Sequence, residues 1–239
     1  VRANQAIDDV CRAYRLPCIS GKDSMKNDVT MHGEKISVPP TILFSLIGNH
    51  ADVRKAVSSD FKRAGDHIYL LGETHQELGA SEFAFMFRDE GSGGIGGEVP
   101  RINPERNLAM YRALTSAMSE GLVASAHDCS DGGLAVALAE CCFGADSGAV
   151  VDISSLSRDC NHLDEWGALF GESLGRILVS VAPDDSNAFA AVMEGNACSR
   201  IGAVDQGDMI TVNYGETEVL QASMSELKKA WQGSLGGDA

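Results

Sequence analysis

The stretch AHDCSDGG, at residues 126–133, constrains the fold of this chain more than any other feature. It joins the small apolar segment VASA to the alanine-rich segment LAVALAECCF. The first segment is typical of a strand and the second of a helix. A plain turn between them needs one glycine and one capping aspartate or serine. This junction carries two aspartates, a serine and two glycines, so it calls for a further explanation.

Strand and helix patterns alternate along the rest of the chain, which predicts an α/β (α+β) fold with a mixed sheet covered by helices. The opening residues, VRANQAIDDVCRAYRLP, read as a helix already under way, which suggests a piece of a longer protein. The polar stretch 51–66 reads as a connection. We therefore expect an incomplete domain at 1–50 and a complete one at 51–235. Predicted strands are 16–20, 41–49, 67–73, 123–127, 149–154 and 175–182, predicted helices are 103–121, 132–143 and 185–194, and 210–220 is a predicted hairpin.

The charge balance limits the possible partners. The chain has 34 acidic and 19 basic residues, a net charge of −15, which argues against nucleic-acid and membrane partners. A phosphate ligand stays possible, because it needs only a local cradle or a bridging metal ion. The seven scattered cysteines form no CxxC pair, and no apolar run is long enough to span a membrane. We expect reduced thiols and a cytoplasmic protein.

AHDCSDGG itself allows two readings. In one, Ser130 or Asp131 caps the following helix and the glycines permit a sharp entry. In the other, Asp128 lies where a strand end meets a helix start, which is the usual ligand crevice of an open sheet. Asp128 would then hold a hard cation such as Mg²⁺, Ser130 would contact phosphate or the water on the metal, and the free N–H groups of the helix start would attract phosphate.

Another polar stretch, ISGKDSMKND at 19–28, is either an exposed turn or a phosphate contact. It is not a Walker A loop, which requires GxxxxGK[ST]. In the functional reading, Gly21 lets the backbone approach the ligand, Lys22 supplies a positive charge and Ser24 supplies a hydroxyl.

Four further features have weaker signals. Glu172, in LFGESLGR, reads first as an exposed glutamate in a turn, and GGIGGEVP (93–100) reads as a loop because no strand leads into it. His127 is more typical of a packing residue than of a catalyst. Cys129 has no obvious base beside it, so we do not assign it as a nucleophile.

Taken together, four segments resemble one known family. PCISGKDSM, VPPTILFSLIG, SAHDCSDGGLAVALAE and LFGESLGRILVSV occur here in the order found in phosphoribosylformylglycinamidine synthase, the glutamine amidotransferase of purine biosynthesis. The HD-x-SDGG pattern is shared with a wider superfamily that includes aminoimidazole ribonucleotide synthetase. GKDSM is narrower and favours the amidotransferase.

The resemblance implies a place in the synthetase part and a set of ligands. The chain would hold the tail of an amino-terminal-type domain and a complete carboxyl-terminal-type domain. The family uses ATP, Mg²⁺ and ammonia from glutamine to convert formylglycinamide ribonucleotide to its amidine. By position, Gly21, Lys22 and Ser24 match nucleotide or substrate contacts, Ser130 matches a nucleotide contact and Asp128 matches a metal ligand. The implied partners are a glutaminase domain or subunit and the upstream half of the synthetase.

Departures from the family pattern leave alternatives open. Short forms of the enzyme carry asparagine where Lys22 stands, and a charged lysine cannot bind Mg²⁺, so Lys22 would face phosphate or substrate. We assign no catalytic residue here and expect the chain alone to be inactive. The alternatives are another ATP-using member of the superfamily, such as aminoimidazole ribonucleotide synthetase, or a structural module that holds ADP and Mg²⁺ without consuming the nucleotide.

Overall fold

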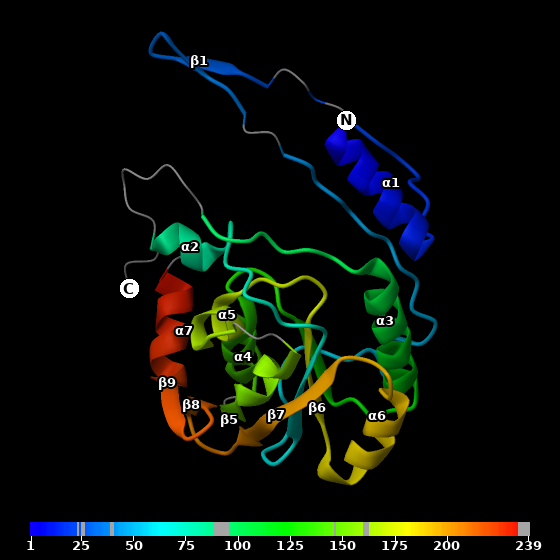
Figure 1. Cartoon of the computed structure of the whole chain (residues 1–239), viewed down its shortest axis with the longest axis vertical. Coiled ribbons are helices and arrows are strands. Elements are labelled where there is room, and N and C mark those ends of the chain that lie inside the picture. The colour runs from blue at the N-terminus through cyan, green and yellow to red at the C-terminus, as the bar shows by residue number, and fades with distance from the viewer. Residues whose placement is uncertain are drawn as a thin grey trace. The chain divides into compact units, whose positions relative to one another are not determined.

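The computed structural model divides the chain into two compact units, Val1–Arg54 and Lys55–Ala239. It describes residues 1–22, 24, 27–38, 41–87, 96–145, 147–159 and 163–233, with backbone only at 157–159. Figure 1 colours both units along the chain. Each unit is described by itself below.

The first unit contains a helix and a small hairpin. Helix α1 (Arg2–Tyr14) ends where Arg15 turns into the left-handed region, at φ 57°. Strands β1 (Val29–Met31) and β2 (Glu34–Ile36) pair antiparallel across a tight turn at His32 and Gly33, both with positive φ. None of the described residues of this unit is buried.

Two strands that the sequence predicts in this unit are absent. The predicted strand at 16–20 and the predicted buried strand at 41–49 have no strand pairing, and Leu43, Phe44 and Ile47 are exposed. The predictions are wrong because a strand needs a partner for its backbone N–H and C=O groups. Among the described residues of this unit, β1 and β2 pair only with each other.

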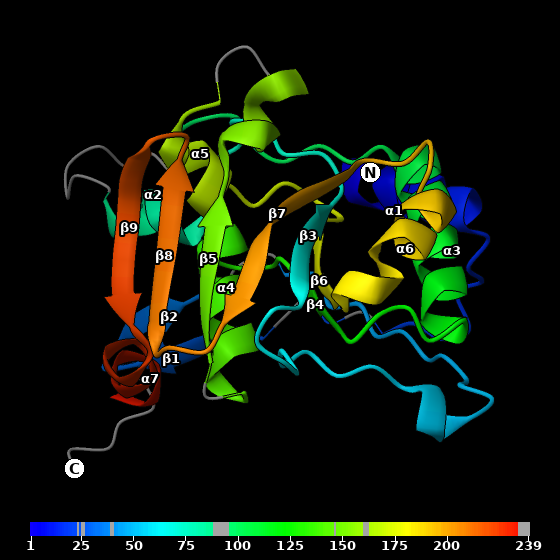
Figure 2. The ribbon, with the colours of Figure 1, turned by 90° about the horizontal axis from the view of Figure 1, so that it is seen from below.

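The second unit is built on a seven-stranded mixed sheet, which confirms the predicted fold class. The strands are β3 (His67–Leu71), β4 (Ser125–Asp128), β5 (Gly148–Asp152), β6 (Ile177–Val181), β7 (Cys198–Asp205), β8 (Met209–Tyr214) and β9 (Thr217–Ser223). Their order is β4-β6-β3-β7-β5-β8-β9, as Figure 2 shows. Neighbouring strands are antiparallel except β5 and β8, which run parallel.

Helices cover both faces of this sheet. The helices of this unit are α2 (Glu82–Met86), α3 (Pro104–Ser119), α4 (Gly133–Phe143), α5 (Glu165–Phe170), α6 (Ser186–Val192) and α7 (Met224–Gly233), with 3₁₀ turns at Ser154–Asp159 and Pro183–Asp185. A further 3₁₀ turn, Val53–Lys55, lies at the boundary between the two units in the sequence. Figure 1 shows α3 and α6 on one side of the strands and α4, α5 and α7 on the other. No helix in the described part of the chain is long and apolar enough to cross a bilayer.

Strand β3 shows why helices are needed on both faces. Its side chains alternate: Ile68 and Leu70 pack with α4 and α5, whereas Tyr69 and Leu71 pack with α3 and α6. All four are buried. Because successive residues of a strand point to opposite faces, such a continuous apolar run requires a cover on each side. The sheet edge that carries the polar turns is thereby held between two helical layers.

Candidate functional site

The register of three strands brings several polar turns to one edge of the sheet. Ile177, the first residue of β6, lies opposite both Leu71, the last residue of β3, and Asp128, the last residue of β4. The turn after β4, the turn after β3 and the loop that leads into β6 therefore meet at this edge. The predicted residues Asp128 and Ser130 lie here.

Asp128 and Ser130 are in direct contact. The Ser130 hydroxyl donates to Asp128 Oδ2, and this hydrogen bond lowers the pKa of the Asp128 carboxyl. Asp128 Oδ1 lies 3.4 Å from Nδ1 of His127, whose Nε2 lies 2.7 Å from Glu140 Oε2. The Asp128 side chain is 70% exposed. The corner thus presents an ionised carboxylate to solvent, with a hydroxyl beside it.

Cys129 has no part in this exposed chemistry. It is buried, and its backbone N–H donates to the Arg176 carbonyl at 3.0 Å. Burial raises the pKa of its thiol to about 11. A thiol with so high a pKa is a poor nucleophile at neutral pH, so Cys129 serves packing.

The double glycine is explained by two different constraints. Gly132 has φ 78°, in the left-handed region that turns the chain into α4. Gly133 has φ 66°, and a Cβ there would lie 2.5 Å from the Gly171 carbonyl oxygen and 2.8 Å from that of Leu169. The first glycine supplies the turn, and the second allows α4 to approach the end of α5.

The sequence predicts free N–H groups at the start of α4, but the structure differs at the first two. The N–H groups of Gly132 and Gly133 are not free for phosphate: Gly132 donates to Glu172 Oε1 at 3.0 Å and Gly133 to the Ser130 carbonyl at 3.0 Å. Glu172 Oε1 also accepts from the N–H of Glu82 at 2.9 Å. Glu172 is therefore a partner of two helix starts, not the free turn residue that its sequence context favoured.

Arg176 lies behind this corner and is 1% exposed. Its guanidinium donates to the carbonyls of Gly171 and Ala168 and lies 3.4 Å from the Thr74 hydroxyl. Burial lowers the pKa of Arg176, and the charges of Glu77 and Glu172 act in the opposite direction. The buried Arg176 guanidinium thus fixes the end of α5, whose backbone contacts Gly133.

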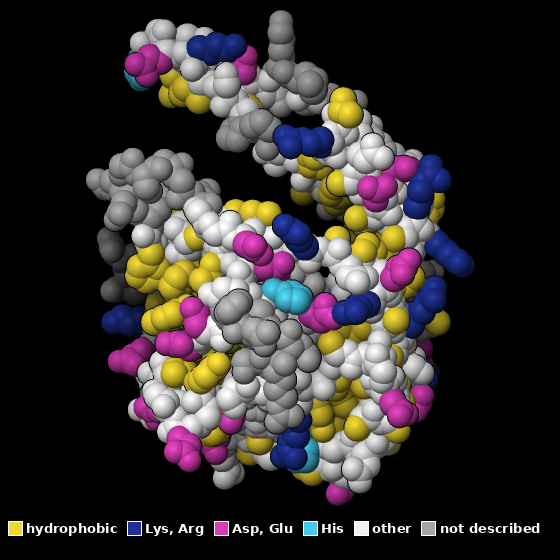
Figure 3. Space-filling model, viewed as in Figure 1, with side chains coloured by type: hydrophobic (Ala, Val, Ile, Leu, Met, Phe, Trp, Pro, Cys, Tyr) yellow, Lys and Arg dark blue, Asp and Glu magenta, His cyan; other side chains and the backbone are white. Residues whose placement is uncertain are grey.

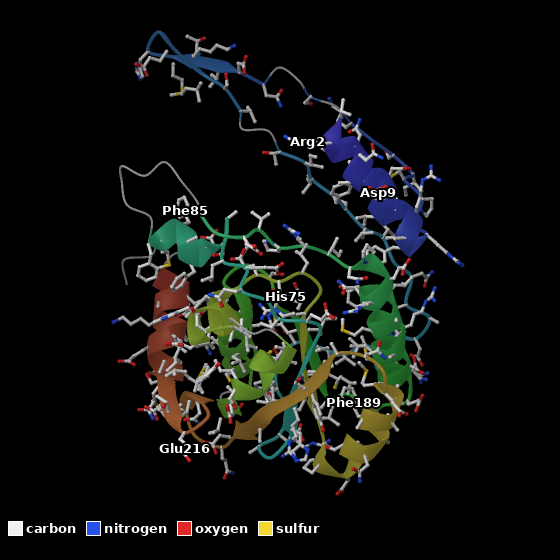
Figure 4. All side chains as sticks on the ribbon, in the orientation of Figure 1. Arg2, Asp9, His75, Phe85, Phe189 and Glu216 are labelled. Atoms are coloured by element: carbon white, nitrogen blue, oxygen red, sulfur yellow. The ribbon has the colours of Figure 1, made fainter. Side chains whose placement is uncertain are left out.

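A second polar group at this edge was missed by the sequence analysis. Glu73 and His75 follow β3, with their side chains 3.5 Å apart, and Glu73 also accepts from Arg106 on α3. Figure 4 labels His75, and at the same place Figure 3 shows a histidine among acidic and basic side chains. The sequence contained this signal, because Glu73 ends the predicted strand 67–73 and His75 follows it, just as Asp128 follows the predicted strand 123–127.

The predicted residues Gly21, Lys22 and Ser24 lie in a loop of the first unit. Lys22 Nζ donates to Ser24 Oγ at 2.9 Å, and Gly21 has open space around its Cα. Asp23, Met25 and Lys26 lie outside the described residues, as do residues 93–95 of GGIGGEVP. Within the first unit, the structure thus shows only the local arrangement of Gly21, Lys22 and Ser24.

Asp128 does not form a metal site with its protein neighbours. No group of three or more His, Cys, Asp and Glu side chains in the described part of the chain could hold a metal ion. Mg²⁺ commonly binds through one or two carboxylates together with phosphate oxygens and waters. The exposed Asp128 carboxylate fits that second arrangement, in which the ion arrives with a nucleotide.

The sequence from residue 63 to residue 215 matches a family model described as "AIR synthase related protein, C-terminal domain". The chain belongs to this family. The match covers well over half of the chain and contains every polar group of the sheet edge described above.

Solved structures share the fold of this AIR synthase-related domain. T. maritima PurL complexed with FGAR has a TM-score of 0.64 and 21% identity over 73% of this chain and 30% of that chain. T. maritima PurL complexed with ATP has a TM-score of 0.59 and 20% identity over 73% and 27%. Phosphoribosylformylglycinamidine synthase II from Thermotoga maritima has a TM-score of 0.61 and 20% identity over 73% and 28%. The chain therefore spans less than a third of the length of these structures.

Proposed function

We propose that this chain is part of an ATP-dependent ligase of the phosphoribosylformylglycinamidine synthase type, and that the sheet edge at Asp128 binds a nucleotide together with Mg²⁺. The observation that carries the proposal is the exposed Asp128 carboxylate beside the Ser130 hydroxyl, at the end of strand β4. Family membership supports it, as does the fold shared with PurL structures complexed with ATP, ADP and AMPPCP.

The residues have distinct roles in this proposal. Asp128 holds the cation that the nucleotide brings, and Ser130 contacts a phosphate or a water on that cation. The cation supplies charge neutralisation for the phosphates. Gly21, Lys22 and Ser24 form a second phosphate or substrate contact, in which Lys22 acts as a point charge. Arg176 and the two glycines keep the corner in place.

The overall reaction in this proposal converts formylglycinamide ribonucleotide, ammonia and ATP to formylglycinamidine ribonucleotide, ADP and phosphate. The ammonia comes from glutamine on a glutaminase domain or subunit. Phosphoryl transfer of this kind depends mainly on positioning and on charge neutralisation. The ligase activity belongs to the whole synthetase, and we expect the chain alone to be inactive.

A structural nucleotide-binding role is the second candidate. It is supported by the described residues of the corner, to none of which a catalytic step is assigned: the Cys129 thiol is buried with a pKa of about 11, and His127 contacts Glu140 and Asp128. In this role the corner binds Mg²⁺-ADP and stabilises the domain by mass action without turning the nucleotide over.

Calorimetry of the chain with Mg²⁺-ADP tests the nucleotide site. Asp128→Ala should weaken binding by about tenfold or more, and Ser130→Ala by about fivefold, the effect of one hydrogen bond. Asp184→Ala is the matched control, because Asp184 is an exposed aspartate in the turn after the opposite end of β6. Equal affinity for the wild type and Asp128→Ala contradicts the role of Asp128.

The ligase reaction is tested on the whole synthetase with ammonia supplied. We expect release of phosphate from ATP that depends on formylglycinamide ribonucleotide. If nucleotide binds at Asp128 but Asp128→Ala leaves this rate unchanged, the structural role is favoured over a catalytic one. Absence of the substrate-dependent release rejects the ligase proposal.

A further inference from the structure

Glu172 occupies an unusual position between two helix starts. Its Oε1 atom accepts from the N–H of Gly132, the N-cap of α4, at 3.0 Å and from the N–H of Glu82, the first residue of α2, at 2.9 Å. A carboxylate that accepts two backbone N–H groups makes charge-assisted hydrogen bonds, which are stronger than neutral ones. At the start of α4, Glu172 thus takes a position that a bound phosphate oxygen could occupy.

Helix α4 has no carboxylate of its own that caps its first turn. Its first turn contains no acidic residue, and no side-chain cap is found among the described residues. The positive end of a helix is stabilised by a negative charge within about one turn. Glu172, supplied by the loop after α5, provides that charge from another element.

One buried cation, Arg176, lies near Glu172. Arg176, which is 1% exposed, bonds to carbonyl oxygens and has the charges of Glu172 and Glu77 nearby. The start of α4 and the buried guanidinium therefore both act on the same carboxylate.

We propose that Glu172 is a built-in anion that fills the helix start, so that the corner selects cation-bound phosphate over free phosphate. The inference rests on the proposed nucleotide site and specifies its ligand. With the Gly132 N–H occupied, an incoming phosphate meets the Ser130 hydroxyl and the Asp128 carboxylate. Asp128 repels a bare phosphate and attracts one that carries a divalent cation. Glu172 is thus a specificity-determining residue, because it favours a phosphate that carries a divalent cation over a bare phosphate.

ADP binding with and without Mg²⁺ tests this inference on the full chain. The wild type should bind metal-free ADP at least about tenfold more weakly than Mg²⁺-ADP. Glu172→Ala should bind metal-free ADP about tenfold more tightly than the wild type does, because the helix start becomes available. Glu172→Gln keeps an oxygen acceptor but loses the charge, so it should show a smaller gain of about threefold. Glu194→Ala removes an exposed glutamate after α6 and should change neither affinity.

A second readout does not depend on nucleotide binding. Addition of inorganic phosphate should shift the backbone amide signals of Gly132 and Glu82 in Glu172→Ala and leave them unchanged in the wild type. If Mg²⁺-ADP binds to no variant while these shifts occur, the proposed nucleotide site and its selectivity are wrong, and only the occupation of the α4 start by Glu172 stands.

The inference is overturned by either of two results. One is wild-type affinity for ADP that does not depend on Mg²⁺. The other is a folded Glu172 variant, with cooperative urea unfolding, that gains neither metal-free ADP affinity nor phosphate-induced amide shifts. If Glu172→Ala does not fold, Glu172→Gln decides the question, because it can still accept from both N–H groups.

Discussion

The two glycine-containing turns, GKDSM at 21–25 and DCSDGG at 128–133, look alike in sequence but differ in how the structure holds them. Gly21 has open space around it, and Lys22 and Ser24 contact each other at 2.9 Å. The second turn lies between β4 and α4, and Gly133 packs directly on the backbone of the α5–β6 loop. The position of such a turn therefore depends more on the strands and helices that flank it than on the residue types within it.

The largest expected difference between the two turns is the reactivity of the cysteine thiols at Cys18 and Cys129. Cys18 is exposed, whereas Cys129 is buried and its pKa is raised to about 11 by burial. At pH 8 only about one Cys129 in a thousand is a thiolate, and the thiolate is the reactive form. An ordinary thiol, with a pKa of about 8.5, is about a quarter thiolate at that pH. We therefore expect iodoacetamide to label Cys129 about 100-fold or more slowly than Cys18, as measured by mass spectrometry of peptides.

The pH dependence sharpens this prediction. Labelling of Cys129 should rise about tenfold for each unit of pH until the pKa of about 11 is approached, provided that the fold persists. Unfolded chain labelled in guanidinium is the control, and there both cysteines should react alike. Rapid labelling of Cys129 in the native chain at pH 8 would show that the second turn is not held as the structure has it.

The cations near the two turns should also differ in their contribution to stability. Arg176→Met removes a buried guanidinium from the carbonyls of Ala168 and Gly171. Buried acceptors left without partners cost about 1–3 kcal/mol each, so we expect a loss of about 3 kcal/mol in the free energy of unfolding. Lys22→Met, at an exposed position, should change it by less than about 0.5 kcal/mol.

Urea unfolding at neutral pH measures both changes. A shift in the transition midpoint at a constant slope reports stability alone. If Arg176→Met costs no more than Lys22→Met, the guanidinium does not hold the loop that supports Gly133.

The sequence predicted most of the second unit because its elements carry their own local signals. Helix α3 has Asn103 as its N-cap, with Oδ1 accepting from the Arg106 N–H at 3.2 Å, and Pro104 at the first position. Strand β7 was not predicted, although it lies between β3 and β5. Its sequence, CSRIGAVD, is rich in small and polar residues, and Gly202 allows the Val150 carbonyl to approach closely. Such a strand is specified by its neighbours and not by its own pattern.

The candidate site was predicted only in part, for a related reason. Asp128 and Ser130 are close in sequence, so their contact follows from the turn itself. Glu172 lies 40 residues from Gly132, to which it bonds, and Arg106 lies 33 residues from Glu73. Contacts of this kind depend on strand order and register, which a single sequence does not define.

Alanine substitution at the glycines of the two turns should also change the free energy of unfolding by different amounts. Gly133→Ala places a Cβ within 2.8 Å of two carbonyl oxygens, at φ 66°. Overpacking and a left-handed backbone each cost about 1–3 kcal/mol, so we expect a loss of about 2 kcal/mol or more. Gly21→Ala meets nothing within 4 Å and should stay within about 0.5 kcal/mol of the wild type. Thermal unfolding compares the two, and equal losses would contradict the close approach at Gly133.

The smallest expected difference is in how salt changes the pKa values of two aspartates, Asp128 and Asp52. The pKa of Asp128 is lowered first by the uncharged Ser130 hydroxyl, whereas the pKa of Asp52, at the end of the first unit, is lowered first by the Arg54 guanidinium. Salt screens an exposed ion pair far more than a hydrogen bond to a neutral group. In 1 M salt the pKa of Asp52 should rise towards its usual value, and that of Asp128 should change little.

The sign of the pH dependence follows from the same contact. Because the pKa of Asp128 is lowered in the folded chain, its hydrogen bond with Ser130 stabilises the fold above the usual aspartate pKa. This contribution is lost as the pH falls through the lowered value. Ser130→Ala should therefore raise the pKa of Asp128, as measured by NMR titration of the carboxyl carbon. An unchanged pKa of Asp128 in Ser130→Ala would contradict the role of the hydroxyl. A response to salt as strong as that of Asp52 would show that an ionic contact lowers both pKa values.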